Sequence, residues 1–142
     1  LVGSEMCIRD RVGTGPYKKN LVELANQLGV RDRVKFYENL SWTELLKRYE
    51  NADVFVILSR HEAFCVSVAE ALASKTPCIV ANTSALREWV DNENCFGISY
   101  PIDLNELAKL MEEVANIQVK KLRIPTWDEV AEEIGKVYER LF

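Results

Sequence analysis

Two glutamates, Glu62 and Glu70, have seven residues between them where a polar loop enters a helix predicted over residues 66–73. The unpaired N–H groups at the start of that helix, together with the positive end of its dipole, are suited to binding a diphosphate. A carboxylate can accept hydrogen bonds from two vicinal hydroxyls, as it does from ribose in dinucleotide-binding folds. Because Glu62 lies in the loop and Glu70 about one turn into the helix, both can face one crevice. Glu70 stands among valine, alanine and leucine, which favours a binding role over a solvated one.

A second polar loop, formed by Asn82, Thr83 and Ser84, follows a strand predicted over residues 77–81. These three side chains either contact a ligand or cap the short helix predicted over residues 85–90. The sequence favours neither interpretation.

Two other reactive side chains lie close to Glu62. His61 is expected to line the cleft rather than to act as a base. Cys65 is not expected to be a nucleophile, because no partner histidine is found beyond the adjacent loop.

The elements that position these loops alternate between strands and helices. The apolar run over residues 53–58 is typical of a central parallel strand buried on both faces. Pro16 is predicted at the first position of a helix that Gly29 ends, and capping boxes at Ser41 and Thr126 begin two further helices. Other strands are predicted over 34–36 and 96–100, and another helix from 103. This order predicts an α/β fold with a Rossmann-like parallel sheet and helices on both faces, whose ligands bind at the carboxyl ends of the strands.

Composition excludes several classes of protein. The net charge is −4 without a basic stripe, so no nucleic acid partner is expected. The longest apolar run, 54–58, is far shorter than the ~20 residues of a membrane span, although peripheral membrane contact stays open. Four cysteines without Cys-x-x-Cys spacing and a single histidine predict no metal site. Free cysteines without a secretory signal are consistent with a cytoplasmic protein.

The first eleven residues mix charged and apolar side chains without a period. We expect residues 1–11 to be a non-native segment, similar to a translated adapter sequence, and residues 12–142 to form the domain. Because the native-like sequence then begins in mid-strand, the chain is expected to be a fragment.

Five segments together resemble the family 4 retaining glycosyltransferases. The stretch from Glu62 to Glu70 resembles that family's E-x7-E region. The other matching segments, in one collinear order between Val12 and Tyr100, are Gly13–Pro16, Asp53–Ser59, Pro77–Glu88 and Asn94–Gly97.

The resemblance implies a GT-B architecture of two Rossmann-like domains, of which this chain is the C-terminal, nucleotide-sugar-binding one. It implies that Glu70 holds the donor ribose and that Glu62, the catalytic candidate, contacts the sugar near its reactive carbon. It also implies donor contacts from the turn at Gly13 and Gly15 and from the backbone of Ala63, Phe64, Cys65 and Val66. Residues 36–39, which include Phe36 and Tyr37, are implied to lie near the nucleotide base.

The resemblance also implies the reaction. A sugar passes with retention from a nucleotide sugar, such as a UDP-, GDP- or ADP-sugar, to a hydroxyl of a glycan, lipid or small-molecule acceptor, with no metal required. The acceptor domain and the family's phosphate-binding Arg and Lys, which precede Gly13, are not in this chain. The isolated chain is therefore expected to be inactive as a hexosyltransferase. Cys65 also departs from the family, which usually has Gly or Ser there.

Other functions remain open at this stage. The chain could be a non-catalytic nucleotide-binding or interaction module, or part of a sugar-nucleotide epimerase of GT-B form. A receiver domain would need an acidic cluster after its first strand, and a dehydrogenase would need Gly-x-Gly-x-x-Gly, whereas Gly15 is followed by Pro16.

Overall fold

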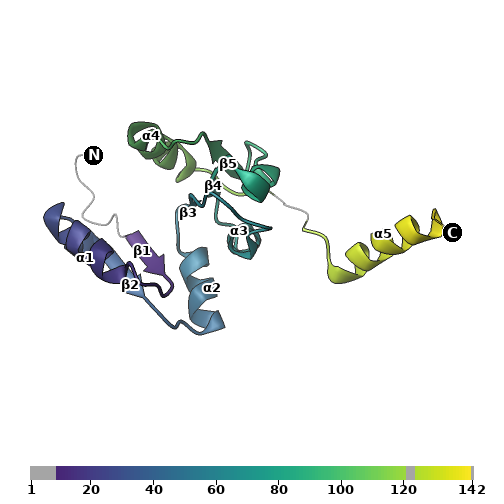
Figure 1. Cartoon of the computed structure of the whole chain (residues 1–142), viewed down its shortest axis with the longest axis horizontal. Coiled ribbons are helices and arrows are strands. Elements are labelled where there is room, and N and C mark those ends of the chain that lie inside the picture. Colours follow the sequence, from purple (N-terminus) through teal and green to yellow (C-terminus); the bar gives the residue numbers. More distant parts are fainter. Residues whose placement is uncertain (1–8, 121–123, 142) are drawn as a thin grey trace. The chain divides into compact units, whose positions relative to one another are not determined.

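The computed structural model describes residues 9–120 and 124–141 and divides the chain into two compact units, Leu1–Leu45 and Leu46–Phe142 (Figure 1). The boundary falls within α2 (Trp42–Glu50). Each unit has its own parallel sheet, and each is described by itself.

The first unit is one βαβ arrangement. Strand β1 (Arg9–Val12) pairs in parallel with β2 (Val34–Tyr37), and α1 (Lys18–Gln27) and the short 3-10 helix η1 (Arg31–Arg33) connect them. The N–H of Gly13 donates to the Tyr37 carbonyl at 3.0 Å. Part of the segment predicted to be non-native, Arg9 to Arg11, thus lies in β1; its origin stays a prediction.

The prediction that Pro16 occupies the first helical position is wrong. Helix α1 begins at Lys18, because residues 16 and 17 form a turn in which the Lys18 N–H reaches the Gly15 carbonyl at 3.3 Å. The end of the helix at Gly29 is as predicted.

The second unit contains a three-stranded parallel sheet with β4 at its centre. Strands β3 (Phe55–Ile57) and β5 (Cys95–Ile98) flank β4 (Cys78–Ala81), whose four residues are all buried. The expectation that residues 53–58 form a central strand buried on both faces is wrong, because β3 is half-buried and lies at one edge of this sheet. The strand buried throughout is β4, and this burial explains why its sequence is apolar without alternation.

Helices cover this sheet. On one face, Ile79 and Ile98 pack with Leu107 and Val114 of α4 (Leu104–Val114). Helix α3 (Val66–Ala73) contacts β3 and β4 and lies on the other side of the strands from α4 (Figure 1). The predicted α/β architecture of parallel strands and covering helices is confirmed, with the strands divided between two sheets.

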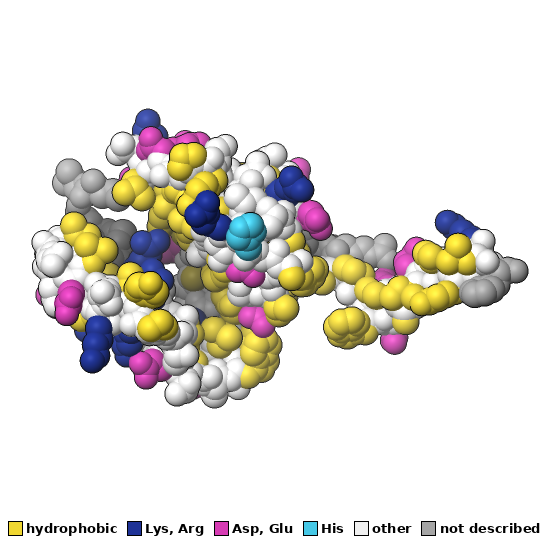
Figure 2. All heavy atoms as spheres, in the orientation of Figure 1, with side chains coloured by type: hydrophobic (Ala, Val, Ile, Leu, Met, Phe, Trp, Pro, Cys, Tyr) yellow, Lys and Arg dark blue, Asp and Glu magenta, His cyan; other side chains and the backbone are white. Residues whose placement is uncertain are grey.

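The remaining elements follow their local sequence signals. The helix predicted over 85–90 is the 3-10 helix η2 (Ser84–Trp89). Both capping boxes form: the Glu44 N–H donates to the Ser41 hydroxyl oxygen at 3.3 Å, and Thr126 and Glu129 make the reciprocal pair at the start of α5 (Trp127–Glu139). Apolar side chains of α5 remain exposed, and Figure 2 shows them along that helix.

Helices α1 and α3 end with the same hydrogen-bond pattern but different residues. In α1, Gly29 has a φ of 66° and Val30 N–H reaches the Ala25 carbonyl; in α3, Lys75 has the same φ and Thr76 N–H reaches Ala71. Both are Schellman motifs, in which a left-handed residue after the helix favours glycine.

Replacing Lys75 with glycine should therefore raise the free energy of unfolding by about 0.5–1 kcal/mol, because the left-handed conformation is strained for a residue with a Cβ atom. Urea denaturation measures this. Lys109→Gly, at an exposed position inside α4, is the control and should lower stability by about 1 kcal/mol. A loss of stability in both variants would contradict the assignment of strain to Lys75.

Candidate functional site

Two loops at the carboxyl end of the second unit's sheet are bonded to each other. The Thr83 hydroxyl, after β4, donates to the Ser59 carbonyl, after β3, at 3.0 Å. The Glu62 N–H donates to the Ser84 hydroxyl oxygen at 3.0 Å. These bonds fix the backbone that carries Glu62.

The structure bears on the capping role left open for the second polar loop, whereas ligand contact by this loop stays a prediction. Thr83 occupies the N-cap position of η2, but its side chain makes no cap hydrogen bond there. Thr83 and Ser84 instead hold the neighbouring loop. Asn82 extends the sheet through its N–H, which donates to the Ile98 carbonyl at 2.8 Å, and its side chain is exposed.

Glu70 is half-buried in α3 and is held by a tyrosine. The Tyr49 hydroxyl donates to Glu70 Oε2 at 3.1 Å. Burial, and after it the charge of Glu70, raises the pKa of Tyr49, so the hydroxyl keeps its proton and acts as a donor. Among the described residues no side chain or backbone group donates to Oε1 of Glu70, and that oxygen can accept from a ligand.

The start of α3 exposes backbone donors next to this glutamate. Cys65 is the N-cap residue and makes no side-chain cap bond, and the side chains of Phe64 and Val66 are exposed on either side of it. The first N–H groups of α3 are thus without a side-chain cap, as an anion site requires.

Trp89 supports this loop. Its Nε1–H donates to the Phe64 carbonyl at 2.7 Å, and the two rings meet edge to face with centroids 5.1 Å apart. The Phe64 carbonyl is therefore occupied, and any ligand contact from that peptide is left to the N–H side.

The backbone conformation of Cys65 is one that favours glycine. Its φ is 68° and its ψ is 72°, in the left-handed region, and the side chain is buried with Sγ 3.3 Å from the Ser67 hydroxyl. A Cβ atom in this conformation costs on the order of 1 kcal/mol.

We expect Cys65→Gly to be more stable than Cys65→Ala by about 1 kcal/mol, because both lose the thiol and only alanine keeps the strained Cβ atom. Thermal and urea unfolding of the pair measures the difference. At Cys78, in the extended backbone of β4, the order should reverse, with glycine the less stable. The same order at both positions would rule out strain at Cys65.

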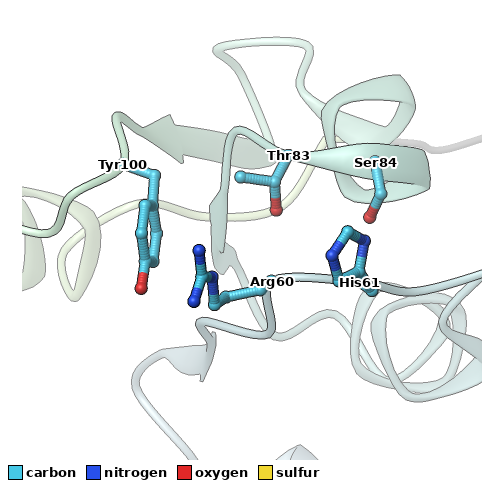
Figure 3. Close-up of a pocket in the computed structure, with 5 residues that line it drawn as sticks. All are labelled: Arg60, His61, Thr83, Ser84 and Tyr100. Carbon is cyan, nitrogen blue, oxygen red and sulfur yellow. The ribbon is translucent and has the colours of Figure 1, made fainter.

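A pocket of about 410 Å³ opens beside these loops and is lined by Arg60, His61, Thr83, Ser84 and Tyr100 (Figure 3). The Arg60 guanidinium lies over the Tyr100 ring, 5.1 Å from its centroid. His61 lines this pocket, and its role toward a donor stays a prediction. Sequence reasoning missed Arg60 and Tyr100, which stand in the loops after β3 and β5.

In the first unit, the predicted residues lie at the carboxyl ends of β1 and β2. Gly13 has a φ of 132°, a conformation that favours glycine, and open space surrounds the Cβ positions of Gly13 and Gly15. Phe36 and Tyr37 end β2 half-buried, and the Arg31 guanidinium lies 5.7 Å from the Phe36 ring centroid. The binding roles of these four residues stay predictions.

Residues 9–120 and 124–141 contain no group of three or more His, Cys, Asp or Glu side chains placed to hold a metal ion. No helix in the same ranges combines the length and apolarity needed to cross a membrane.

Residues 10–125 match the family described as glycosyl transferases group 1. An uncharacterized glycosyltransferase of Methanocaldococcus jannaschii is 32% identical over 138 residues, covering 89% of this chain and 35% of the relative. The MMP alpha-(1->4)-mannosyltransferase of Mycolicibacterium hassiacum is 29% identical over 138 residues, covering 89% of this chain and 33% of the relative. The chain thus spans about a third of the length of these curated relatives.

Solved structures share the fold. A sucrose-phosphate synthase from Thermosynechococcus elongatus superposes with a TM-score of 0.70, covering 94% of this chain and 38% of that one at 23% identity. WaaG, a glycosyltransferase involved in lipopolysaccharide biosynthesis, gives a TM-score of 0.66, covering 76% of this chain and 29% of that one at 19% identity.

Proposed function

The chain belongs to the glycosyl transferases group 1 family, and we propose that it is the part of a sugar transferase that binds a nucleotide-sugar donor. The observation that carries the proposal is the hydrogen bonding of the Glu70 carboxylate. One of its oxygens accepts from Tyr49, and its other oxygen has no protein donor in the described part of the chain. This half-buried carboxylate lies on the helix whose uncapped start suits a diphosphate.

In the proposed complex, Oε1 of Glu70 accepts hydrogen bonds from the vicinal hydroxyls of the donor ribose. The N–H groups at the start of α3 hold the diphosphate, and Glu62 contacts the sugar near its reactive carbon. Because the Glu62 N–H is bonded to Ser84, the backbone that carries its carboxylate is fixed before the donor arrives.

The proposed reaction breaks the bond between the sugar's reactive carbon and the diphosphate oxygen, which keeps the electron pair. The helix N–H groups stabilise the negative charge that develops there. An acceptor hydroxyl forms the new bond on the same face, with retention of configuration, and its proton leaves with the nucleoside diphosphate.

The whole protein's activity belongs to the same proposal. The acceptor is a glycan, lipid or small molecule bound with the help of a second domain, and the donor is a UDP-, GDP- or ADP-sugar that needs no metal. A cytoplasmic location, with or without peripheral membrane contact, is consistent with such substrates.

Nucleotide binding by the chain tests the proposal. Nucleoside diphosphates and nucleotide sugars should raise the melting temperature, because a ligand at about 100 times its Kd stabilises by about 2.7 kcal/mol, equivalent to several degrees. Glu70→Ala should abolish the shift, and Tyr49→Phe should reduce it because the carboxylate loses the donor that positions it. Glu113→Ala, at an exposed glutamate of α4, is the matched control and should keep the full shift.

The panel also distinguishes the competing functions. A shift with one base that Glu70→Ala removes supports a donor site and identifies the nucleotide. A folded sample that no nucleotide stabilises, or equal shifts with and without Glu70, would overturn the donor-site assignment.

A further inference from the structure

The pocket lined by Arg60, His61, Thr83, Ser84 and Tyr100 adjoins Glu62, whose N–H is bonded to Ser84, but contains none of the residues proposed to hold the donor's ribose and diphosphate. None of the residues that line it belongs to the stretch 63–70, which carries Glu70 and the start of α3. It opens instead between the loops that follow β3, β4 and β5 (Figure 3). A pocket at this edge of a parallel sheet is where substrates bind.

Arg60 brings an uncompensated positive charge to this pocket. No carboxylate lies within salt-bridge distance of it among the described residues, and its guanidinium carbon lies 5.1 Å from the centroid of the Tyr100 ring. The aromatic face orients the guanidinium without neutralising it. The planar fork of N–H donors therefore remains available, and such a fork matches the oxygens of a phosphate.

Ser84 brings a second donor. Its oxygen accepts from the Glu62 N–H, and in the described part of the chain no acceptor lies near enough to take its hydroxyl hydrogen. Its φ is 42°, a strained conformation for a residue other than glycine. Such strain is common where a protein fixes a side chain toward a ligand.

His61 completes the donor set. Figure 3 shows the imidazole beside Ser84, with the Arg60 guanidinium between it and the Tyr100 ring. An imidazole ring N–H donates in either protonation state. The pocket thus presents a cationic fork, a hydroxyl and an imidazole from different directions, which suits a tetrahedral anion better than a planar one.

We propose that this pocket binds a phosphate monoester carried by the second substrate, the sugar acceptor, with Arg60 as the charge-bearing contact and Ser84 and His61 as further hydrogen-bond donors. This inference rests on the proposed function, because the donor's own diphosphate is assigned to the start of α3. It narrows the acceptor from any hydroxyl compound to a phosphorylated one.

Binding to the 142-residue chain tests the inference. Hexose 6-phosphate, inorganic phosphate and the unphosphorylated hexose are titrated against 15N-labelled protein, and chemical-shift changes are followed by residue. We expect the hexose phosphate to shift signals at residues 60, 61, 84 and 100, and the plain hexose to leave them unchanged. Arg60→Gln should weaken hexose phosphate binding about ten- to hundredfold, since a charge-assisted contact is lost.

Three variants control for folding and for general charge. Arg87→Gln removes an exposed arginine of η2 that does not line the pocket, and should bind as the unaltered chain does. Arg60→Lys keeps the charge without the fork and should retain part of the affinity. Ser84→Ala should weaken binding several-fold, and thermal melting checks that each variant is folded.

Competition separates this inference from the proposed function. A nucleoside diphosphate should bind equally to the unaltered chain and to Arg60→Gln, and should not displace the hexose phosphate. Displacement would place the phosphate in the donor site and overturn the inference. The inference would also be overturned if Arg60→Gln bound the hexose phosphate as tightly as the unaltered chain does, or if the unaltered chain did not bind it. Binding of a hexuronic acid as tight as that of the hexose phosphate would overturn it as well. Loss of nucleotide binding with intact hexose phosphate binding would overturn the proposed function instead.

Discussion

Replacing Ile79 with alanine should lower the free energy of unfolding by about 3–4 kcal/mol. Ile79 is fully buried in the central strand β4 and lies in register between Val56 of β3 and Phe96 of β5. Its side chain packs in the cluster that includes Leu107 and Val114 of α4. Alanine would leave a cavity that neither strand nor helix can close without moving.

Urea denaturation of the variant measures this loss. Ile134→Ala, at a half-exposed position of α5, provides the same chemical change outside the core and should alter stability by less than about 0.5 kcal/mol. If Ile79→Ala cost less than about 1 kcal/mol, the sheet and α4 would not share the core described above.

Removing the carboxylate of Asp91 should cost about 2 kcal/mol at neutral pH. One oxygen, Oδ1, accepts from the N–H groups of Glu93, Asn94 and Cys95 at 2.7–2.9 Å, and Oδ2 accepts from the Asn94 side chain at 3.0 Å. Asn94 in turn accepts from the Lys120 N–H, so the turn before β5 is bonded to the chain after α4. Asp91→Ala leaves these donors to water.

The cost should depend on pH with a definite sign. Burial of the Asp91 carboxyl opposes its ionisation, but the N–H groups of Cys95, Asn94 and Glu93 together outweigh burial and lower its pKa. A lowered pKa in the folded state gives stability that is fully present above the ordinary aspartate pKa of about 3.9 and is lost as the pH falls through the folded pKa.

Unfolding curves from pH 7 downward compare the unaltered chain with Asp91→Ala. The difference between them should be constant above about pH 5 and should shrink below about pH 3.9. Asp53→Ala, which removes an exposed aspartate, should show no such trend. A difference that persists unchanged to the lowest pH would mean that the charge of Asp91 contributes nothing.

Local signals in the sequence were sufficient for most elements. The eight-residue helix α3 has the predicted bounds, and the capping boxes at Ser41 and Thr126 form because each side chain needs only a partner three residues away. The strand predicted over residues 77–81 is β4. In each case the deciding interactions lie within one turn or one strand.

Contacts between distant residues could not be predicted in this way. Tyr49 is separated from Glu70 by 21 positions, and Arg60 from Tyr100 by far more, so no local pattern links either pair. The sequence predicted Glu70 as a ligand contact but not the tyrosine that holds it. The division of the strands between two sheets likewise depends on pairing rather than on strand propensity.

The left-handed backbone conformation at three positions could not be predicted from the residue types found there. Lys75, Cys65 and Ser84 all have positive φ, although none is glycine, asparagine or aspartate, the residues that usually indicate this conformation. At Gly13 and Gly29 the glycine itself indicates a positive φ, and the structure has one there. The turn at Pro16 shows the opposite error, because proline suits the first turn of a helix and also a turn before it.

The three-stranded sheet of the second unit contains two buried thiols whose rate of chemical labelling can report how often the sheet opens. Cys78 and Cys95 are partners in register on β4 and β5 and are fully buried; burial raises the pKa of both, and with the added charge of Asp91 raises that of Cys95 to about 12. Because the thiolate is the reactive form, a thiol reagent labels them only while the strands are separated. The labelling rate therefore reports how often the scaffold of the candidate site comes apart, and its slowing by a bound ligand would measure affinity without any assay of sugar transfer.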